Sequence, residues 1–547
     1  MSAGAGSGRA PEPEEAEAEP EEAEAGRDRT PPGSAAPAPT PSTRERHGLT
    51  RRQLLGGAGG GVVALALAGL AGYEWPHPRP APVKAKTPAN EVQGMSFVSR
   101  PDLRPPRVLI RHHGSRLSGR GPSNPPYIFL AARTYLSDAE SQPGLMVVDR
   151  RGALVWFRPL TTLAPFDFQV QEYQGRPVLT WWQGKVVNGY GLGNGELAGT
   201  DYKGLLEVRA GDGLQADLHE LLLTSRGTAL ITAFARVSAD LSSVGGPSHG
   251  TLLTGHAQEV DLATGKLLMD WDSLGHVRLD ETYQKYSPGP FDYFHINSIA
   301  EAPDGNLIIS ARNTWAIYKV DRSSGRIMWR MNGKRSDFAM PGPARFYWQH
   351  DARPHGTARM TVFDDGATPS EERQSRGLLL SMDEAKRRVT LLTAFEHPAG
   401  FLSANQGNVQ LLPDGRAFVG WGNQPYFSEF APDGELLLDG ELPIGYHSYR
   451  AYTREWSGRP TSPPDVAARG NPAGGNIVYA SWNGATEVHR WVVLAGGTPG
   501  TLGQVGAQDK SGFETEIAVN SNEPYFAVVA LDASGREIGR SAPVRSA

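Results

Sequence analysis

The 547-residue sequence contains no cysteine. Disulfide bonds, thiolate zinc sites and cysteine nucleophiles are therefore excluded, although this absence alone does not fix the cellular compartment. The chain also lacks a strong excess of charge of either sign, because its formal net charge is −5 at pH 7 over the whole length. This balance gives no reason to expect a nucleic-acid partner.

Long apolar runs are scarce too, and the one near the N-terminus follows a pair of arginines. Residues 50–72 read TRRQLLGGAGGGVVALALAGLAG. Paired Arg51 and Arg52 ahead of an apolar stretch are similar to a twin-arginine export signal, a route for proteins already folded in the cytoplasm. The apolar part is about 18 residues long, close to what spans a bilayer. We expect export, with residues 48–73 as a cleaved signal or a membrane anchor, and membrane contact possible through residues 54–72.

The segments on either side of this signal have little apolar surface to bury. Residues 1–47 are acidic and rich in Pro and Ala, and we expect them to be disordered. Residues 74–94, rich in Pro and Lys, read as a linker. The remaining chain has the composition of a globular protein and is expected to work outside the cytoplasm, either anchored or secreted.

Two kinds of strand–turn–strand unit alternate through the middle of the chain. The first kind has six copies, centred on Gly175, Gly227, Gly305, Gly356, Gly415 and Gly458. Six hairpins with polar turns alternate with them, beginning near Asp149 and including one with its turn near Gly213. Two hairpins make one four-stranded blade, so the count predicts a six-bladed β-propeller over residues 95–465. The two ends of this region are expected to complete one blade together.

After Pro472 the pattern changes to short strands that alternate apolar and polar residues. Trp482, Trp491 and Tyr525 supply large side chains for a small core. Residues 466–547 therefore suit a fibronectin-III-like or immunoglobulin-like β-sandwich, and the fold class as a whole is all-β. This region shows no catalytic cluster, which favours a packing or interaction role.

A polar side chain recurs a few residues ahead of each first-kind turn, where a propeller strand opens on its central channel. The positions are Asp167, His219, His295, His350, Asn405 and the Tyr446–His447–Ser448 group. Histidine can hold zinc, but metal-binding histidines want carboxylate partners and close spacing, and these lie on separate blades. Arg312 nearby would repel a cation. An oxyanion site is favoured over a metal site or plain filling of the channel.

Several stretches resemble the bacterial arylsulfotransferases (ASST) and their relatives over about residues 125–465. They are LHE, DYFHINSIAEAPDGNLIISARNTWAIYKVD, RIMWRMNGKRSDF, WQHDAR and NQGNVQLLPDGRAFVGWG. The resemblance implies a six-bladed propeller and an exported enzyme without a cofactor. It also implies transfer of a sulfuryl group from a phenolic sulfate to a phenolic acceptor by a ping-pong route, without a nucleotide sulfate donor.

Residue by residue, the resemblance makes His350 the transiently sulfated nucleophile. It makes His219, His295, Asn297 and Arg312 the residues around the sulfuryl group. A neutral imidazole is a competent nucleophile near pH 7, and fixed donors suit the charge that develops on sulfuryl oxygens. For each of these residues the alternative interpretation is a purely structural role. For the whole chain the alternative function is a non-enzymatic propeller that binds an anionic ligand or partner.

Two further roles are hypotheses from position alone. Asp351 directly follows His350 and is a candidate to orient it. An aromatic wall for an aryl ring is expected from Trp181, Trp182, Phe294, Trp315, Tyr347 and Trp348, although aromatic residues also fill propeller cores.

Overall fold

The computed structural model describes residues 94–113, 125–137 and 139–547. Within these ranges the chain consists of strands, loops and three short 3₁₀ turns, so the all-β class is confirmed. None of the described helical turns is long and apolar enough to cross a membrane. The predicted disordered tail, the twin-arginine segment and the linker up to residue 93 lie outside the described residues.

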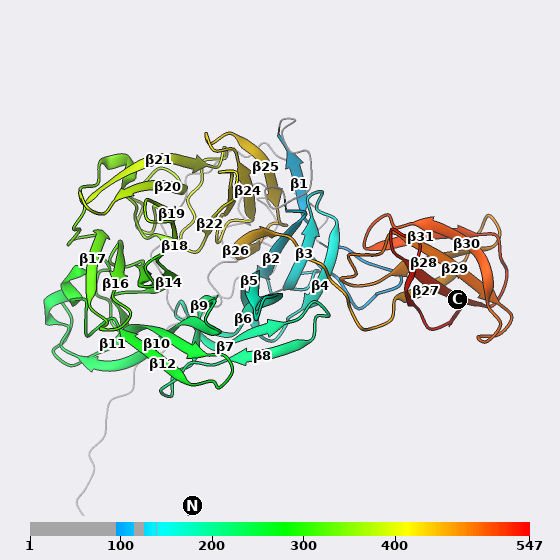
Figure 1. The fold of residues 1–547 in the computed structure, drawn as a ribbon, viewed down its shortest axis with the longest axis horizontal. Helices are drawn as coiled ribbons and strands as arrows, with labels where there is room; N and C mark the ends of the chain where they lie inside the picture. Colours follow the sequence, from blue (N-terminus) through cyan, green and yellow to red (C-terminus); the bar gives the residue numbers. More distant parts are fainter. Residues whose placement is uncertain (1–93, 114–124, 138) are drawn as a thin grey trace, which may run out of the picture. The chain divides into compact units, whose positions relative to one another are not determined.

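Four antiparallel sheets between residues 109 and 454 are separate from one another (Figure 1). Three of them have four strands, and the fourth has five. One has the order β26–β2–β3–β4, with β2 Tyr127–Thr134, β3 Gly144–Asp149, β4 Leu154–Pro159 and β26 Tyr446–Arg454. The next comprises β14 Ile296–Glu301, β15 Leu307–Ala311, β16 Ala316–Val320 and β17 Ile327–Asn332. Another comprises β18 His350–His355, β19 Arg359–Asp364, β20 Arg376–Asp383 and β21 Arg388–Glu396. The fourth has β22 Asn408–Leu411, β23 Ala417–Gly420, β24 Tyr426–Phe430 and β25 Leu436–Glu441, with β1 Leu109–His112 added at its edge.

A nine-stranded sheet joins two runs of four strands through a single bridge between Gly193 and Ala216. The first run is β5 Ala164–Tyr173, β6 Arg176–Val187, β7 Tyr190–Ala198 and β8 Gly204–Val208. The second run is β9 Ala216–Leu223, β10 Thr228–Ala239, β11 Gly250–Asp261 and β12 Leu267–Asp272, with the short β13 Phe291–Asp292 beside β11. The 3₁₀ turns are Ser242–Val244, Leu279–Glu281 and Gly342–Ala344.

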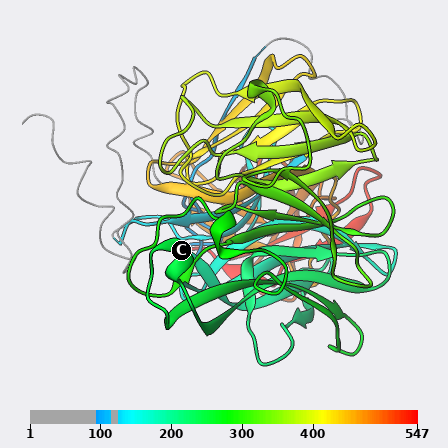
Figure 2. The ribbon, with the colours of Figure 1, turned by 90° about the vertical axis from the view of Figure 1, so that its left-hand side faces the viewer.

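The first strands of these units contact one another in a cycle. The order is β26, β5, β9, β14, β18 and β22, and β22 contacts β26 again. Successive sheets bury apolar side chains between them: Leu230 and Leu253 of one sheet share a core with Ile299 and Ile309 of the next. Burying each such side chain stabilises the fold by about 1.5–3 kcal/mol. The sheets appear as successive layers in the side view (Figure 2).

Five of the six predicted first-kind hairpins are confirmed, namely β5–β6, β9–β10, β14–β15, β18–β19 and β22–β23. The sixth, around Gly458, is wrong: β26 pairs instead with β2, so the two ends of the region do share one sheet. Pro460, Pro463 and Pro464 follow Gly458, and proline cannot donate to a strand ladder. The polar turn expected near Gly213 is also misplaced, because β7 and β8 are joined through residues 199–203.

Buried or largely buried ion pairs link the first strands at the centre of the cycle. Arg450 of β26 lies 3.0 Å from Asp167 of β5 and 3.3 Å from Glu220 of β9. Arg353 of β18 bonds the same Glu220 at 2.6 Å and Asp351 at 2.7 Å. Burial raises the pKa of Glu220 above its ordinary value. These ion pairs connect β26, β5, β9 and β18, which are not hydrogen-bonded to one another as neighbouring strands.

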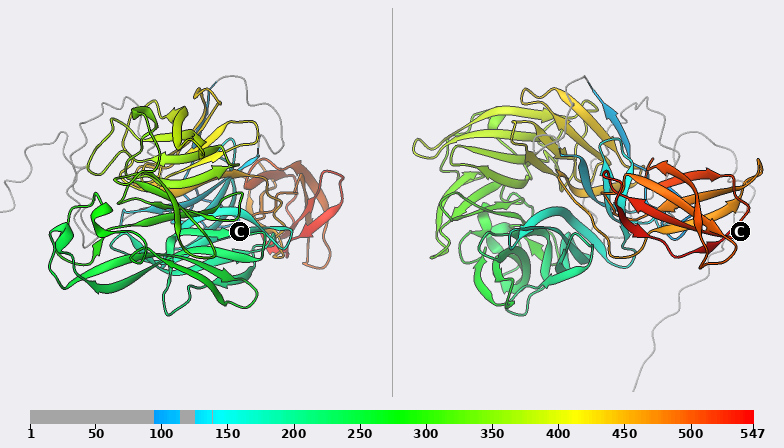
Figure 3. Two further views of the ribbon diagram at one scale, coloured as in Figure 1. Left: turned by 60° about the vertical axis from the view of Figure 1, so that its left-hand side comes forward. Right: turned by 45° about the vertical axis from the view of Figure 1, so that its right-hand side comes forward.

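The C-terminal residues form two further antiparallel sheets (Figure 3). The first comprises β27 Asp465–Gly470, β28 Asn476–Ser481 and β31 Glu514–Val519. The second comprises β29 Arg490–Gly496, β30 Gly503–Asp509, β32 Tyr525–Leu531, β33 Glu537–Arg540 and β34 Val544–Arg545. Val478 and Ile517 of the first sheet share one core with Trp491 and Phe526 of the second.

Candidate functional site

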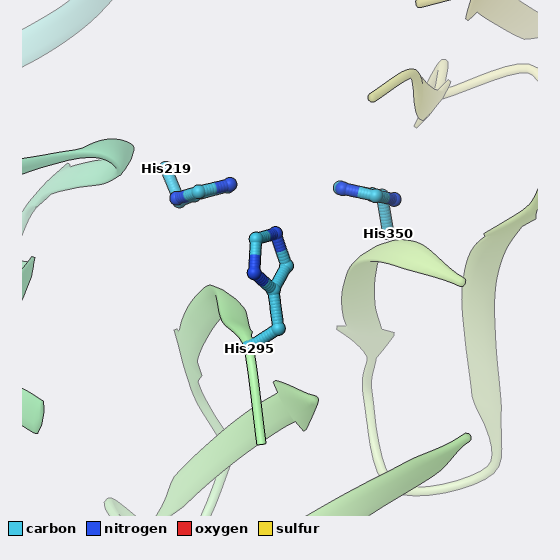
Figure 4. Close-up of side chains that lie close together, drawn as sticks. All are labelled: His219, His295 and His350. Atoms are coloured by element: carbon cyan, nitrogen blue, oxygen red, sulfur yellow. The ribbon is translucent and has the colours of Figure 1, made fainter. Parts of the chain in front are cut away.

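Three histidines from three consecutive units point their rings at one another (Figure 4). His219 lies on β9, His295 directly precedes β14, and His350 is the first residue of β18. One ring nitrogen of each lies within 4.8 Å of the other two. The sequence analysis placed these residues on separate strands, and the structure brings them together.

Each of the three rings is held from behind by its own carboxylate. Nδ1 of His219 lies 2.6 Å from Asp217, Nδ1 of His295 lies 2.5 Å from Asp292, and Nδ1 of His350 lies 2.7 Å from Asp365. A ring whose Nδ1–H donates to a carboxylate presents Nε2 as its free nitrogen. The nitrogens that converge are therefore the Nε2 atoms.

Irregular backbone aims these rings at the centre. The ladders show a register shift between Ile296 and Ser298 of β14 and another between His350 and Arg353 of β18. A β-bulge bends its strand and re-aims the side chain beside it. His295 adopts a φ of 53°, a sparsely populated conformation for a residue with a side chain. The Asp292 carboxylate accepts the backbone N–H of His295 at 2.9 Å and so fixes this backbone together with the ring.

Burial sets the protonation state of His350. Its side chain is 1% exposed, and burial, aided by the charge of Arg312, holds its pKa well below the ordinary value. The imidazole is therefore neutral at pH 7, with a lone pair on Nε2. The backbone N–H of Gln406 donates to this atom at a long 3.3 Å. Burial also lowers the pKa of His295, against the opposing pull of Asp292.

Arg312 is attached to this cluster through the backbone of its own hairpin. Its N–H donates to the carbonyl of His295 at 3.0 Å. Its guanidinium lies over the ring of Trp348, 4.7 Å from the centroid, and donates to the carbonyl of Ala404 at 3.1 Å. Burial lowers the pKa of Arg312 to about 10, so the side chain carries its charge at pH 7.

Other residues of the predicted set do not join the cluster. The side chain of Asn297 donates to the carbonyl of Gln349 at 2.6 Å and so ties β14 to the segment before β18. Asp167 belongs to the ion pairs around Arg450. His447 is buried elsewhere and stacks on Tyr135. Asn405 lies in the loop before β22, next to the Gln406 whose N–H reaches His350.

The hypothesis that Asp351 orients His350 is wrong. The carboxylate of Asp351 bonds Arg353 and the backbone N–H of Val409, whereas Asp365 holds the His350 ring. The sequence reasoning missed all three orienting carboxylates. Asp217 and Asp292 stand two and three residues ahead of their histidines, which is a usable signal. Asp365 follows the opposite strand of the hairpin and needs the register of β18 with β19.

Half of the predicted aromatic wall gathers beside Arg312. Trp315 packs edge-on against Trp348 and Tyr347, and its face stacks on Tyr283. Trp315, Tyr347 and Tyr283 line a pocket of about 150 Å³. Trp181, Trp182 and Phe294 are instead buried in hydrophobic cores.

Comparison with known proteins gave one family and several distant structures. Residues 169–442, half of the chain, match the family model described as Arylsulfotransferase (ASST). No curated protein sequence matches.

Among solved structures, one similarity is to a protein of unknown function from Bacteroides caccae, at 11% identity and a TM-score of 0.37 over 60% of this chain and 98% of the other. A second is to a protein from Lactobacillus plantarum, at 14% identity and a TM-score of 0.33 over 77% of this chain and 97% of the other. A third is to a catalytically inactive virginiamycin B lyase from Staphylococcus aureus with quinupristin, at 11% identity and a TM-score of 0.28 over 70% of this chain and 95% of the other. Scores this low carry no argument about function.

Proposed function

Because the chain belongs to the arylsulfotransferase (ASST) family, we propose that it moves a sulfuryl group from a phenolic sulfate ester to a phenolic acceptor, with His350 as the nucleophile. Family membership indicates sulfotransferase activity in general. The aryl sulfate donor, the absence of a nucleotide sulfate and the passage through a sulfohistidine belong to the proposal. One observation carries it: three carboxylate-held imidazoles converge on one point, and one of them, His350, is neutral, with only a long 3.3 Å contact from the Gln406 N–H described at its Nε2.

The first half of the reaction forms an N–S bond and breaks an S–O bond. The Nε2 lone pair of His350 attacks sulfur, and the electrons of the ester bond leave on the phenolate oxygen. A proton carried into the reaction on Nε2 of His295 or His219, whose Nδ1–H stays on its carboxylate, passes to that oxygen. The His350 ring becomes positive as the bond forms, and Asp365 at Nδ1 stabilises that charge.

The three sulfuryl oxygens carry the charge of the transition state, and the site supplies donors for them from different directions. Arg312 contributes a permanent charge. His219 and His295 present Nε2 to the same point, and Asp217 and Asp292 at Nδ1 stabilise positive charge on these two rings. Fixed donors of this kind typically contribute about 10²–10³ each to turnover.

The second half reverses the same bonds with another phenol. The acceptor hydroxyl gives its proton to the histidine that was left neutral, and its oxygen attacks sulfur while the N–S bond breaks. His350 returns to its neutral form, so no cofactor is consumed. The aromatic pocket around Trp315 and Tyr347 is suited to an aryl ring.

The same proposal includes the architecture. The cycle of first-strand contacts and the four-stranded units support a six-bladed β-propeller over residues 95–465. The core shared by the two C-terminal sheets supports a fibronectin-III-like sandwich over residues 466–547. The Arg51–Arg52 motif and the apolar run after it support export by the twin-arginine route to an extracytoplasmic place of action, as an anchored or a secreted protein.

The test is release of phenol from a fluorogenic aryl sulfate by the purified chain, with and without a phenolic acceptor. We expect acceptor-stimulated release that disappears in His350→Ala and persists in His256→Ala. His256 is a matched control, since it also bonds a carboxylate, Asp270, through Nδ1 at 3.0 Å. Release that ignores the acceptor would mean hydrolysis instead. No release from folded protein with several donors would favour an anion-binding propeller without chemistry.

A further inference from the structure

The three converging nitrogens also form a donor set of a different kind. We propose that Nε2 of His219, His295 and His350 together bind a divalent transition-metal ion such as Zn²⁺, with one coordination position left open. This inference does not rest on sulfuryl transfer, because it concerns only the three imidazoles and the groups behind them.

The ligand types and their spacing fit such an ion. Three imidazole nitrogens with one open position form a common zinc arrangement. Zinc–nitrogen bonds of about 2.1 Å place tetrahedral ligands about 3.4 Å apart, and here the three nitrogens lie within 4.8 Å of one another. Ring rotations that move each nitrogen inward by about an ångström bring the three nitrogens to the spacing of zinc ligands. The side chain of His295 is 13% exposed, whereas those of His219 and His350 are 3% and 1% exposed.

Each ring has the partner that metal-bound histidines need. A histidine on a metal almost always donates its other N–H to a carboxylate, carbonyl or water, which fixes the ring and makes the ligand nitrogen more basic. Asp217, Asp292 and Asp365 fill this role at 2.6, 2.5 and 2.7 Å. The sequence argued against a metal because such partners and close spacing were not visible, and the structure contains both.

The positive charge of Arg312 opposes metal binding less strongly than the sequence analysis expected. Three carboxyl groups stand directly behind the imidazoles. The charges of Arg312 and Arg450 both act on His350, but Arg450 is paired with Asp167 and Glu220. The Arg312 guanidinium lies over the Trp348 ring and donates to the carbonyls of Ala367 and Ala404. A metal ion at His350 Nε2 would displace the long contact from the Gln406 N–H to this atom.

Metal binding and sulfuryl transfer would compete for Nε2 of His350. If the proposed function holds, Zn²⁺ inhibits phenol release, and an excess of chelator restores it. If transfer is absent, the metal site is still measured by binding alone, so the two proposals can fail separately.

The experiment is calorimetric titration of the chelator-treated full chain with Zn²⁺, together with the visible spectrum after addition of Co²⁺. We expect one ion per chain with a low-coordinate Co²⁺ spectrum. His219→Ala, His295→Ala and His350→Ala should each weaken binding more than 100-fold, while His256→Ala leaves it unchanged. Asp217→Asn should weaken it about 10–100-fold, the usual cost of losing a partner behind a ligand.

Two results would overturn the inference. One is a wild-type chain that gives neither titration heat nor a Co²⁺ spectrum, a measurement that needs no variant to fold. The other is binding that survives all three histidine substitutions, which would place the ion elsewhere. The more conservative His219→Gln serves where the alanine variant unfolds, and circular dichroism of the metal-free proteins identifies such a case.

Discussion

Replacing Arg450 with methionine should destabilise the fold far more than removing an exposed arginine. The side chain of Arg450 is fully buried, and its guanidinium serves Asp167, Glu220 and the carbonyl of Asn297. Without it, Glu220 keeps Arg353 at 2.6 Å, whereas Asp167 keeps the hydroxyl of Tyr452 at 2.9 Å but loses the cation 3.0 Å away.

The magnitude follows from that distance. Two charges 3.0 Å apart attract by roughly 5 kcal/mol at an effective dielectric constant of about 20. Breaking a buried pair by removing one partner typically costs about 3–5 kcal/mol, because the other charge stays buried. We expect Arg450→Met to lower the free energy of unfolding by that amount. Arg450→Met with Asp167→Asn should recover about 1–3 kcal/mol of it, since the uncompensated charge is gone.

The assay is urea unfolding followed by tryptophan fluorescence, with the free energy obtained from the midpoint and slope. Arg151→Met is the control: this arginine is 80% exposed and bonds Asp149 at 2.7 Å, and such surface pairs contribute about 0–1 kcal/mol. An Arg450→Met loss below about 1 kcal/mol, or a double variant no more stable than the single one, would refute the account of the central ion pairs.

Three further outcomes are expected. Arg312→Gln should lower kcat/KM for an aryl sulfate about 10²–10³-fold, because a charged donor is lost; an unchanged value would remove Arg312 from the site. Since burial lowers the pKa of His350, single-turnover rates should show no loss from its protonation until the pH is well below about 6.5; an acid limb centred at 6.5 would contradict this. The lowered pKa values of His350 and His295 mean that the unfolded chain binds more protons, so the urea midpoint should fall as pH drops below about 6.5, and less steeply in His350→Gln; equal slopes would exclude His350 as the cause.

The strand pattern was readable because each hairpin carries its own turn chemistry. Gly305 follows Pro303 and Asp304, and it adopts a φ of 81° that a turn can demand of glycine. The same signal misled at Gly458, where prolines prevent the second strand and a segment more than three hundred residues earlier in the chain takes its place. Local turn residues do not specify a partner strand from the other end of the chain.

The three histidines and Arg312 could be found from short motifs, but the carboxylates that hold the histidine rings could not all be found in this way. Asp217 and Asp292 stand two and three residues ahead of their histidines in the sequence. Asp365 can be assigned to His350 only once the β18–β19 register is known. Arg450 stands in the alternating stretch YHSYRAY and gives no local sign of burial. The free-energy cost of burying the Arg450 charge is offset by the carboxylates of Asp167 and Glu220 on other strands. This pairing depends on tertiary packing and is not visible in the local sequence.

The most direct test of the account is the mass of the chain after exposure to an aryl sulfate without acceptor. We predict one added sulfuryl group on the peptide containing His350. It should be absent from His350→Ala, present in His256→Ala and removed by adding a phenol. A chain that stays unmodified while it transfers sulfuryl groups between phenols, or one modified at another residue, would contradict a reaction through His350.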